Sequence, residues 1–509
     1  MPAPAMIKTL AVAARDRARL GEIAAVASRF GLETLLARIG IACGGDAGED
    51  KTGDLPQRTR LAIEALGPTF VKLGQILGTR GDLLAPEWIA EFEKLHSQAP
   101  TLPFDALRPA VEEALGQPPE QAFARFDSIP LAAASMAQVH RAWLDDGRAV
   151  VLKIRRPGVR PRIEADLRIV AQLAALAEHA SAEARRFSPR ALARQLADSL
   201  RDELDFTIEG RNADRLREDF AGDRRVLVPD IHWAWSSETL LVMDFVEGLP
   251  PRDGETLRAH GIDPAQIAAT GADMVLDMVL VNGRFHADPH PGNLLCLPGN
   301  RIAPLDLGSI GHVSPKRREE FLSFVTALQS GDPGGLADTL ALWSDGHDVP
   351  RENVVRAAER LVARHGGGRI VLSALIGDFL PILRDERLVL PPDLLLIFRA
   401  LLTIDGVLTG IQPDFDLSGP MARAGLRVAQ ARLAPERWQA TAQALVWELL
   451  RLGDDAPRLI RAAVRRLEAP PVAEAAADDA AILAAGRWIA AALLAGLALV
   501  AGAILFGHG

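Results

Sequence analysis

Two short motifs in the middle of the chain constrain its fold more than any other feature. One runs from His286 through Asp288 to Asn293, within FHADPHPGN, and the other is DLG, Asp306 to Gly308. The apolar residues between them predict a strand that ends just before the second motif. Each motif alone is weak evidence, because an Asp before a Gly is usually part of a turn. Together they indicate one site with two carboxylates and an amide.

These residue types at this spacing are what phosphoryl transfer on a protein-kinase-like fold requires. Asp288 and Asn293 stand five positions apart, as the Asp and Asn do in the kinase loop H-R-D-x-x-x-x-N. In that chemistry one Asp orients or deprotonates the acceptor, while the Asn and a second Asp hold the metal on the phosphates. We therefore predict that Asp288 is catalytic and that Asn293 and Asp306 bind Mg²⁺ on ATP.

The same loop offers a second interpretation, a metal site made of His286, Asp288 and His290. Their i, i+2, i+4 spacing does not match the common zinc-site spacings. The prolines on either side of His290 instead predict a rigid, extended loop that presents Asp288. No Gly-x-Ser-x-Gly motif or Cys/His arrangement points to a covalent nucleophile. The phosphoryl-transfer interpretation is therefore preferred.

Length, charge and cysteine content exclude several other classes of protein. The chain has 509 residues, enough for two or three domains. A net charge of -9 argues against a nucleic-acid-binding protein, which normally shows a basic surface. The two cysteines, Cys43 and Cys296, form neither a disulfide framework nor a zinc motif, which favours a reducing compartment.

An uncharged apolar segment, Trp488 to Phe506, lies near the C-terminal end of the sequence. At about 1.5 Å per residue it nearly matches a hydrocarbon core of about 30 Å, so it predicts a single membrane span. A buried core helix, or a short hairpin bent at Gly496, is the alternative. Several arginines precede the segment and no Lys or Arg follows it, so the positive-inside rule places the body of the protein in the cytoplasm.

Residues 126 to 156 predict the first strands of a nucleotide-binding lobe. An Asp146-Gly147 turn separates Ala132 to His140 from Arg148 to Ile154, and Asp-Gly between two apolar runs is a strong hairpin signal. Lys153 lies in the second run, at the position of the lysine that pairs with phosphates in kinases. A lysine that faces inward from an apolar strand is costly without an anionic partner. We therefore predict that Lys153 is a catalytic residue that binds the phosphates.

Ordinary kinases have a Gly-rich loop at the start of this hairpin, whereas this chain has an Ala-rich one. The residues predicted to contact the nucleotide there are Ala132, Ala133, Ala134, Ser135, Met136, Ala137 and Val139. Their Cβ atoms restrict the backbone and reduce access to its N–H groups, and a plain β-turn is the alternative. Further along, Thr239 to Phe245 predicts a buried strand. It resembles the kinase hinge, with Asp244 and Val246 at the adenine edge.

Lys72 and Gln75 stand at i and i+3 in the segment KLGQ and so share a helix face. Alone, this pattern is typical of a solvated helix. The chain also contains the Ala-rich loop, the strand of Lys153, the acidic Glu203-Leu204-Asp205 and the HADPHPGN loop. With these motifs, the stretch from Leu66 to Pro100 resembles the signature of the UbiB/ADCK family of atypical kinases. The resemblance covers most of the chain.

The resemblance implies roles for further side chains. Glu209 would be the glutamate that pairs with Lys153. Glu203 and Asp205 would face the KLGQ helix, and this contact would regulate entry to the site. Asp205 and Glu209 share a helix face if the helix is continuous between them. The family pattern REAAN appears here as IEGRN, from Ile208 to Asn212, so the register of this helix stays open.

The resemblance also implies an α+β, protein-kinase-like bilobal fold with a helical N-terminal extension and a C-terminal transmembrane helix. The expected segments are the extension (1–122), the N-lobe (123–246), the helical C-lobe (247–468), a linker (469–486) and the membrane anchor (487–507). Within the C-lobe, helices are predicted over 264–282, 315–330, 332–345, 351–365 and 391–408.

The implied function is an atypical kinase-like ATP-binding protein or ATPase that supports ubiquinone biosynthesis at the bacterial inner membrane. Its partners would be a small-molecule or lipid ligand, the membrane and enzymes of quinone biosynthesis, but no nucleic acid. Protein phosphorylation is not expected, because no APE-type activation segment follows Asp306. Two alternatives remain: a small-molecule kinase of the aminoglycoside or choline type, and a non-catalytic, nucleotide-gated scaffold.

Overall fold

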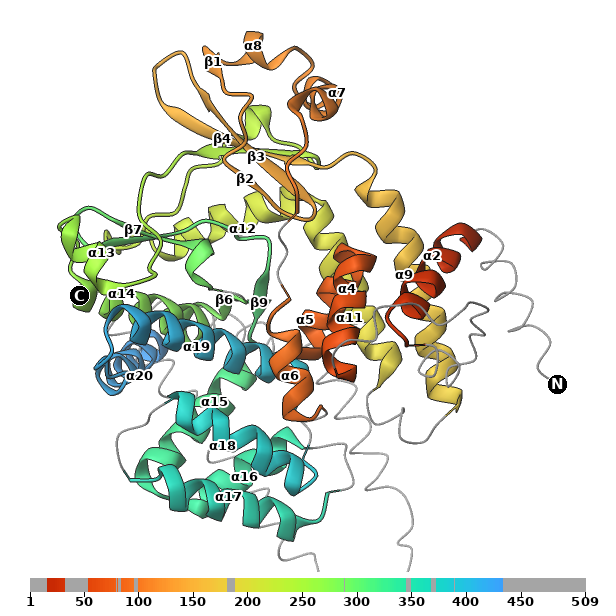
Figure 1. The fold of residues 1–509 in the computed structure, drawn as a ribbon. Helices are drawn as coiled ribbons and strands as arrows, with labels where there is room; N and C mark the ends of the chain where they lie inside the picture. The colour runs from red at the N-terminus through yellow and green to blue at the C-terminus, as the bar shows by residue number, and fades with distance from the viewer. Residues whose placement is uncertain are drawn as a thin grey trace, which may run out of the picture. The chain divides into compact units, whose positions relative to one another are not determined.

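The structure is a computed structural model, and its fold is shown in Figure 1. The described residues are 16–32, 54–78, 80, 84–95, 99–180, 188–287, 289–344, 349–367, 372–388 and 390–433. Residues up to Ala431 belong to one unit, and the second unit, 432–509, is described only at its first two residues. The predicted linker and membrane anchor therefore lie outside the described residues, and so does Asp288.

An antiparallel sheet forms the smaller lobe of the fold (Figure 1). Its strands are β1 (Arg125–Phe126), β2 (Ala132–Ala133), β3 (Ala137–Trp143), β4 (Ala149–Arg155) and β5 (Leu240–Asp244). They pair in the order β1-β3-β4-β5, with β2 added to β3. The predicted β3–β4 hairpin is confirmed, and Gly147 supplies the positive φ of 85° that its turn needs. The buried strand predicted at the hinge is confirmed as β5.

Two helices that precede the sheet cover one of its faces. They are α7 (Phe104–Leu115) and α8 (Pro119–Ala122). Leu107 of α7 packs in one apolar core with Leu152 and Ile154 of β4. Alternate residues of a strand point to opposite faces, so Lys153 points away from α7. Both helices lie within the range 1–122 that was expected to form the extension, but they pack with the N-lobe sheet.

The larger lobe is mostly helical and lies below the sheet in Figure 1. Its helices are α13 (Gly254–Ala259), α14 (Pro264–Asp277), α15 (Pro315–Ser330), α16 (Pro333–Trp343), α17 (Arg351–His365), α18 (Leu372–Asp385), α19 (Pro392–Ile411) and α20 (Ser418–Leu433). A π-helical turn, η2 (Met278–Asn282), follows α14 directly. The helices predicted over 315–330 and 351–365 are confirmed residue for residue, and the others differ only at their ends.

Two short sheets carry the predicted site on the C-lobe. They are β6 (Arg284–His286) with β9 (Ile310–His312), and β7 (Leu294–Leu297) with β8 (Arg301–Pro304). A 3-10 turn, η3 (Pro291–Asn293), lies between β6 and β7. β8 is the strand that was predicted to end before Asp306. Gly283, with φ of 67°, turns the chain from η2 into β6, and a Cβ there would lie 2.8 Å from the Val313 carbonyl oxygen.

Two C-lobe segments have the length and apolarity of membrane spans, Pro264–Asn282 and Asp393–Ile411. They are 72% and 61% buried inside the protein. Both contribute to the apolar core of the lobe, which also contains Phe324 and Phe379. We therefore interpret them as core helices, and they do not bear on the span predicted at Trp488 to Phe506.

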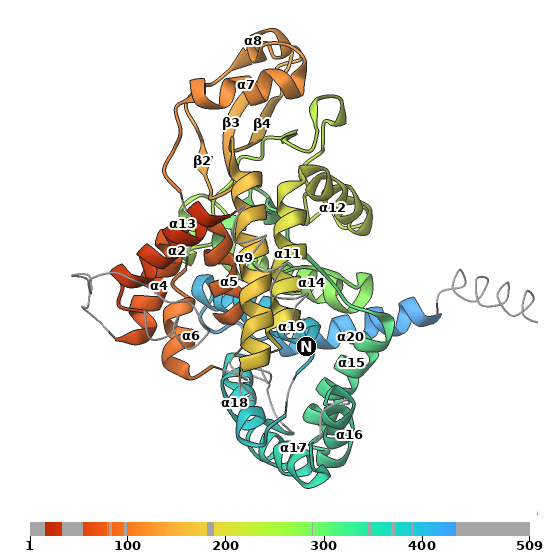
Figure 2. The same ribbon diagram turned by 90° about the vertical axis from the view of Figure 1, so that its right-hand side faces the viewer.

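A third group of helices, named here the helical cap, shares its own apolar core. Its members are α2 (Arg17–Arg29), α4 (Leu55–Leu66), α5 (Pro68–Gly78), α6 (Pro86–Phe92), α9 (Val159–Ala180) and α11 (Pro189–Leu204). α9 and α11 follow β4 in the sequence and run side by side (Figure 2). The cap thus combines the predicted extension with an insertion in the N-lobe. Gly74 allows α5 to approach Leu95, because a Cβ there would lie 2.4 Å from its Cδ1.

A buried polar cluster fixes α5 within this cap. Asp166 on α9 is 1% exposed and accepts hydrogen bonds from Arg19 Nε at 2.6 Å and from the Thr69 hydroxyl at 2.8 Å. Arg19 also donates to the carbonyl oxygen of Leu66, at 2.6 Å. A buried carboxylate is stable only when it is paired and hydrogen-bonded. These bonds therefore hold α2, the start of α5 and α9 together.

Candidate active site

Lys153 on β4 lies between two carboxylates. Its Nζ donates to both oxygens of Glu209, at 2.9 and 2.8 Å, and lies 3.4 Å from Asp306 Oδ1. Glu209 comes from α12 (Phe206–Asp219), and Asp306 from the loop after β8. The Glu209 side chain is 5% exposed and that of Lys153 is 16% exposed. The Lys153–Glu209 pair that the resemblance implied is present in the structure.

Helix α12 borders the DLG motif with two of its residues. Asn212 Nδ2 donates to the Leu307 carbonyl at 3.0 Å, and Glu209, one turn earlier, pairs with Lys153 beside Asp306. These bonds define the helix register that IEGRN left open. Gly210 replaces the Ala of the family pattern. A Cβ at this position would lie only 2.8 Å from the Trp233 ring, so glycine fits here without moving that ring.

The charges of this cluster shift the pKa values of its three members. The Lys153 ammonium holds the pKa of Asp306 well below its usual range. Burial raises the pKa of Glu209 to about 7, because the loss of hydration outweighs the attraction of Lys153. Burial alone would lower the pKa of Lys153, but Asp306 and Glu209 outweigh it and the net shift is upward. Asp306 therefore stays ionised, and its side chain is 48% exposed, open to a cation.

Strand β6 and the turn η3 present the first motif. His286 ends β6, and Asn293 ends η3. His290 Nδ1 accepts the Gly292 N–H at 2.9 Å, and its carbonyl oxygen accepts the Asn293 N–H at 2.9 Å. These bonds fix the turn that carries Asn293. Asp288 lies outside the described residues, so its predicted role and the alternative metal site that includes it stay predictions.

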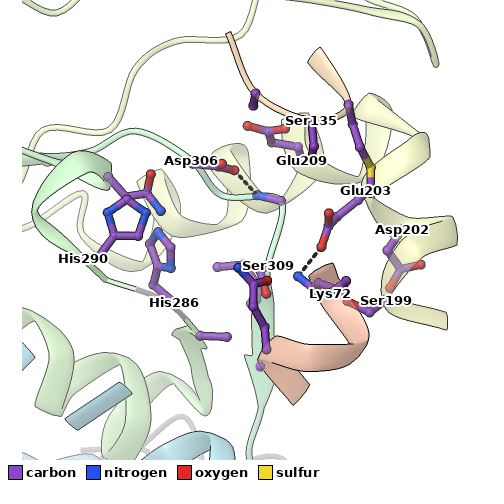
Figure 3. A pocket seen from close by; sticks show the side chains of 18 of the residues that line it. Lys72, Ser135, Ser199, Asp202, Glu203, Glu209, His286, His290, Asp306 and Ser309 are labelled. Atoms are coloured by element: carbon purple, nitrogen blue, oxygen red, sulfur yellow. Dashed lines mark hydrogen bonds and ion pairs between the residues drawn. The ribbon is translucent and has the colours of Figure 1, made fainter. Parts of the chain in front are cut away.

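The cluster lines a cavity of about 350 Å³. Figure 3 shows Glu209 and Asp306 on one side of it, His286 and His290 together on another, and Lys72 beside Glu203 on a third. The predicted site residues that line the cavity are Lys72, Gln75, Ala134, Ser135, Met136, Ala137, Lys153, Glu203, Glu209, Asn293 and Asp306. The fold thus brings together residues from the KLGQ helix, both lobes and the Ala-rich loop.

The Ala-rich loop is a tight hairpin whose tip is anchored in the helical cap. The Ala134 N–H donates to the Ala137 carbonyl at 2.8 Å and closes the turn. Met136 at the tip is 7% exposed and belongs to the apolar core of the cap. Arg156 fixes the loop by two hydrogen bonds. Its backbone N–H donates to the Met136 carbonyl at 2.9 Å, and its Nε donates to the Ala134 carbonyl at 2.8 Å. The loop position therefore depends on the position of the cap.

The residues predicted to contact the nucleotide that do not line this cavity are Ala132, Ala133, Val139, Asp244 and Val246. The first three belong to β2 and β3. Asp244 and Val246 line a second cavity, of about 280 Å³, together with Arg301. The Asp244 side chain meets His232 Nε2 at 2.8 Å. The cavity of about 350 Å³ thus contains Lys153 and the predicted metal ligands, whereas the predicted adenine-edge residues line the second cavity.

The helical cap forms another wall of the larger cavity, and an ion pair joins its two sequence segments. Lys72 Nζ on α5 pairs with Glu203 on α11, and these side chains are 22% and 25% exposed. Gln75 Nε2 donates to the carbonyl oxygen of Leu95 at 3.2 Å. The KLGQ residues thus join α5 to both α11 and the end of the α6 segment.

Asp205 does not join this wall. Its carboxylate caps α12, accepting the Thr207 N–H at 3.0 Å and the Thr207 hydroxyl at 2.7 Å. The expectation that Asp205 faces the KLGQ helix beside Glu203 is therefore wrong. The condition for a shared helix face with Glu209, a helix continuous through Asp205, is not met, because α11 ends and α12 begins at Asp205. The local capping bonds satisfy this carboxylate.

Comparison with known proteins places the chain in a family. The ABC1 atypical kinase-like domain matches residues 94–340, and the UbiB helical domain matches residues 367–416. "Probable protein kinase UbiB" of Xylella fastidiosa is 33% identical over 417 residues, 79% of this chain and 75% of that protein. The protein of the same name in Pseudomonas paraeruginosa is 35% identical over 371 residues, 71% of this chain and 69% of that protein. This chain belongs to the ABC1/UbiB family of atypical kinase-like proteins.

Two further similarities were found. The uncharacterized protein slr1919 of Synechocystis is 33% identical over 369 residues, and the chain spans 64% of that relative's length. A structure of Rv3197 from Mycobacterium tuberculosis in complex with erythromycin aligns with 69% of this chain and 86% of that one, at 21% identity and a TM-score of 0.46. Membership of the UbiB family confirms the expected kinase-like fold of mixed helix and strand.

Sequence reasoning missed the cavity residues that α11 and α19 contribute in this UbiB-family chain. They are Gln195, Ser199, Asp202, Leu396 and Arg399. α11 belongs to the helical cap, and α19 lies within the match to the UbiB helical domain. Only Arg399 carried a local signal, because it is the one basic residue of an otherwise mostly apolar helix. The others look like ordinary polar positions on a helix.

Proposed function

We propose that this protein binds Mg-ATP in the cavity of about 350 Å³ and transfers the terminal phosphoryl group to water or a small acceptor. The observation that carries the proposal is Lys153, held between Glu209 and Asp306 on the cavity wall. An ammonium group fixed by a helix glutamate is the phosphate-binding group of kinase-like sites. Lys153 would bind the phosphate oxygens, and Glu209 would keep its Nζ in position.

The donor set beside Lys153 fits Mg²⁺. Asp306 supplies an ionised carboxylate and Asn293 an amide oxygen, and this hard cation prefers oxygen ligands. Within the described ranges, no three His, Cys, Asp or Glu side chains gather into a complete metal site. Two protein ligands suit Mg²⁺, because it takes its other ligands from phosphates and water. When bound, the ion would neutralise charge on the phosphates.

The surroundings of the site favour a small acceptor over a protein. Only residues 309–314 separate the DLG motif from α15. They form β9 and end at Ser314, the N-cap residue of α15, so no activation segment lies between them. The helical cap, with Lys72 and Glu203, forms a wall of the cavity. Asp288 would orient water or the hydroxyl group of a small or lipid-like molecule.

We extend the proposal to a role in ubiquinone biosynthesis at the bacterial inner membrane. It rests on membership of the UbiB family and on the apolar segment near the C-terminal end. The segment 487–507 would anchor the protein by a single span, with the kinase-like body in the cytoplasm. A lipid-like ligand and enzymes of quinone biosynthesis would then be its partners.

A nucleotide-gated scaffold without turnover is a second candidate function. The observation that favours it is the helical cap, whose apolar core includes Met136 of the Ala-rich loop and whose helices form one wall of the cavity. In that case, nucleotide binding would shift the cap and change its contacts with a lipid or protein partner.

The decisive experiment uses the purified full-length protein in detergent. Mg-ATP should raise its melting temperature, EDTA should abolish that increase, and inorganic phosphate should be released from ATP. Stabilisation without formation of ADP, in the presence and absence of phenolic quinone precursors, would favour the scaffold. If Mg-ATP neither stabilises the protein nor is turned over by it, both candidate functions are refuted.

A further inference from the structure

We propose that Arg399 on α19 binds the terminal phosphoryl group of the nucleotide. This inference rests on the proposed binding of Mg-ATP and adds the residue that distinguishes ATP from ADP. It also gives the helical domain, residues 367–416, a direct part in the site of the kinase-like domain, residues 94–340.

The position of Arg399 sets it apart on its helix. Its neighbours Phe398 and Ala400 are 3% and 0% exposed, whereas Arg399 is half-buried. With Leu396, one turn earlier, it lines the same cavity as Lys153. A cationic group at this wall suits a cavity that receives an anionic ligand.

The packing of α19 indicates which part of the nucleotide Arg399 meets. α19 contacts both β6 and β9, the strands that flank the two motifs. β6 ends at His286, just before Asp288, and β9 begins at Ile310, just after Gly308. Lys153 enters the same cavity from the N-lobe sheet. The terminal phosphoryl group must lie between the phosphate-binding lysine and the loop that orients the acceptor, which is the side that α19 borders.

Arginine chemistry suits this contact. A planar guanidinium donates two parallel hydrogen bonds to phosphate oxygens, which an ammonium group does not. In other phosphoryl-transfer enzymes an arginine at the terminal group stabilises the charge of the transition state. ADP lacks this group, so the contact is measurable as a difference between two nucleotides.

The test compares Mg-ATP and Mg-ADP affinities of the full-length parent, Arg399→Ala and Arg399→Lys by titration calorimetry. Arg399→Ala should weaken Mg-ATP binding about tenfold or more, which corresponds to about 1.4 kcal/mol, and Mg-ADP binding less than about twofold. Arg399→Lys keeps the positive charge but cannot donate two parallel hydrogen bonds, so its loss of Mg-ATP affinity should be intermediate. Arg364→Ala is the matched control, because Arg364 lies on α17, pairs with Asp378 and is 52% exposed.

Equal weakening of both nucleotides, or an ATP affinity equal to the parent's, would overturn the proposal. The ratio of the two affinities is measured within one preparation, so a smaller folded fraction does not change it. If Arg399→Ala does not fold, Arg399→Lys decides the question by the same ratio. A parent protein that binds neither nucleotide would refute the proposed function. A parent that prefers ATP, with that preference intact in the variants, would refute only the role of Arg399.

Discussion

Two lysine–glutamate pairs border the same cavity and differ in their surroundings. Figure 3 shows the second pair, Lys72 with Glu203, and the Glu209 side chain of the first. The Lys153–Glu209 pair joins β4 to α12, engages both carboxylate oxygens and leaves Glu209 5% exposed. The Lys72–Glu203 pair joins two helices of the cap, at 22% and 25% exposure. Asp306 adds a second carboxylate only to the first pair, among the described residues.

The difference in burial indicates two purposes for the same residue types. Removing one partner of a buried pair is strongly destabilising, because the other charge stays buried. A pair near the surface contributes only about 0–1 kcal/mol, so it opens at small cost. We infer that Lys153–Glu209 is a fixed part of the phosphate site, and that Lys72–Glu203 is a contact that breaks when the cap moves.

The largest expected effect is on function at the buried pair. Asp306→Asn removes the carboxylate beside Lys153 at nearly constant size, so Mg-ATP should no longer raise the melting temperature and phosphate release should fall to background. Scanning fluorimetry and a phosphate assay measure both. Asp146→Asn, in the β3–β4 turn at 51% exposure, is the matched control and should behave like the parent. Full stabilisation of the Asp306→Asn protein by Mg-ATP would remove Asp306 from the metal site.

The pH dependence of stability should identify the buried glutamate. The folded pKa of Glu209, about 7, lies above its ordinary value of 4.5, so its contribution to stability is complete below pH 4.5 and is lost as the pH rises through 7. Glu209→Gln lacks this titration. The free energy of unfolding of the parent, relative to the variant, should therefore fall by up to about 3 kcal/mol across this window. Denaturant titrations at several pH values measure it, and parallel curves for the two proteins would contradict it.

A smaller effect is expected where the Ala-rich loop meets the helical cap. Met136→Ala removes a side chain that is 7% exposed from the apolar core of the cap, so stability should fall by about 2 kcal/mol. Amide hydrogens of α5 should also exchange faster. Ser135→Ala, next to it in the loop, should change stability by less than about 0.5 kcal/mol. Unaltered exchange in α5 of the Met136→Ala protein would show that the loop and the cap are independent.

The smallest effect is expected at the Lys72–Glu203 pair, whose side chains are 22% and 25% exposed. A double-mutant cycle of Lys72→Met and Glu203→Gln should give a coupling energy below about 1 kcal/mol. High salt should reduce it further, because screening acts on exposed charges. Urea unfolding of the four proteins measures the cycle. A coupling above about 2 kcal/mol would mean that this pair is held as firmly as a buried one and that the cap does not open there.

The sequence by itself determined the local elements and many of the residues that line the cavity. The Asp146-Gly147 turn between two apolar runs predicted the β3–β4 hairpin, and strand alternation put Lys153 on the face away from α7. The helix predicted over 315–330 is α15, which begins at Pro315 after the capping Ser314. These features were predictable because turn geometry, capping and side-chain alternation depend on interactions within a few residues.

Only the tertiary structure decided which segments meet at the cavity. The helical cap joins α4, α5 and α6 to α9 and α11 across the intervening strands, and α19 brings Leu396 and Arg399 to the cavity from the far end of the described chain. Asp205 carries the same carboxylate as Glu203 but is held by Thr207, so a local bond displaced the expected distant one. An apolar periodicity marks a face that must be buried, but many faces share that pattern. Which of them pack together depends on shape and close contact, as at Gly74, and these exist only once the chain has folded.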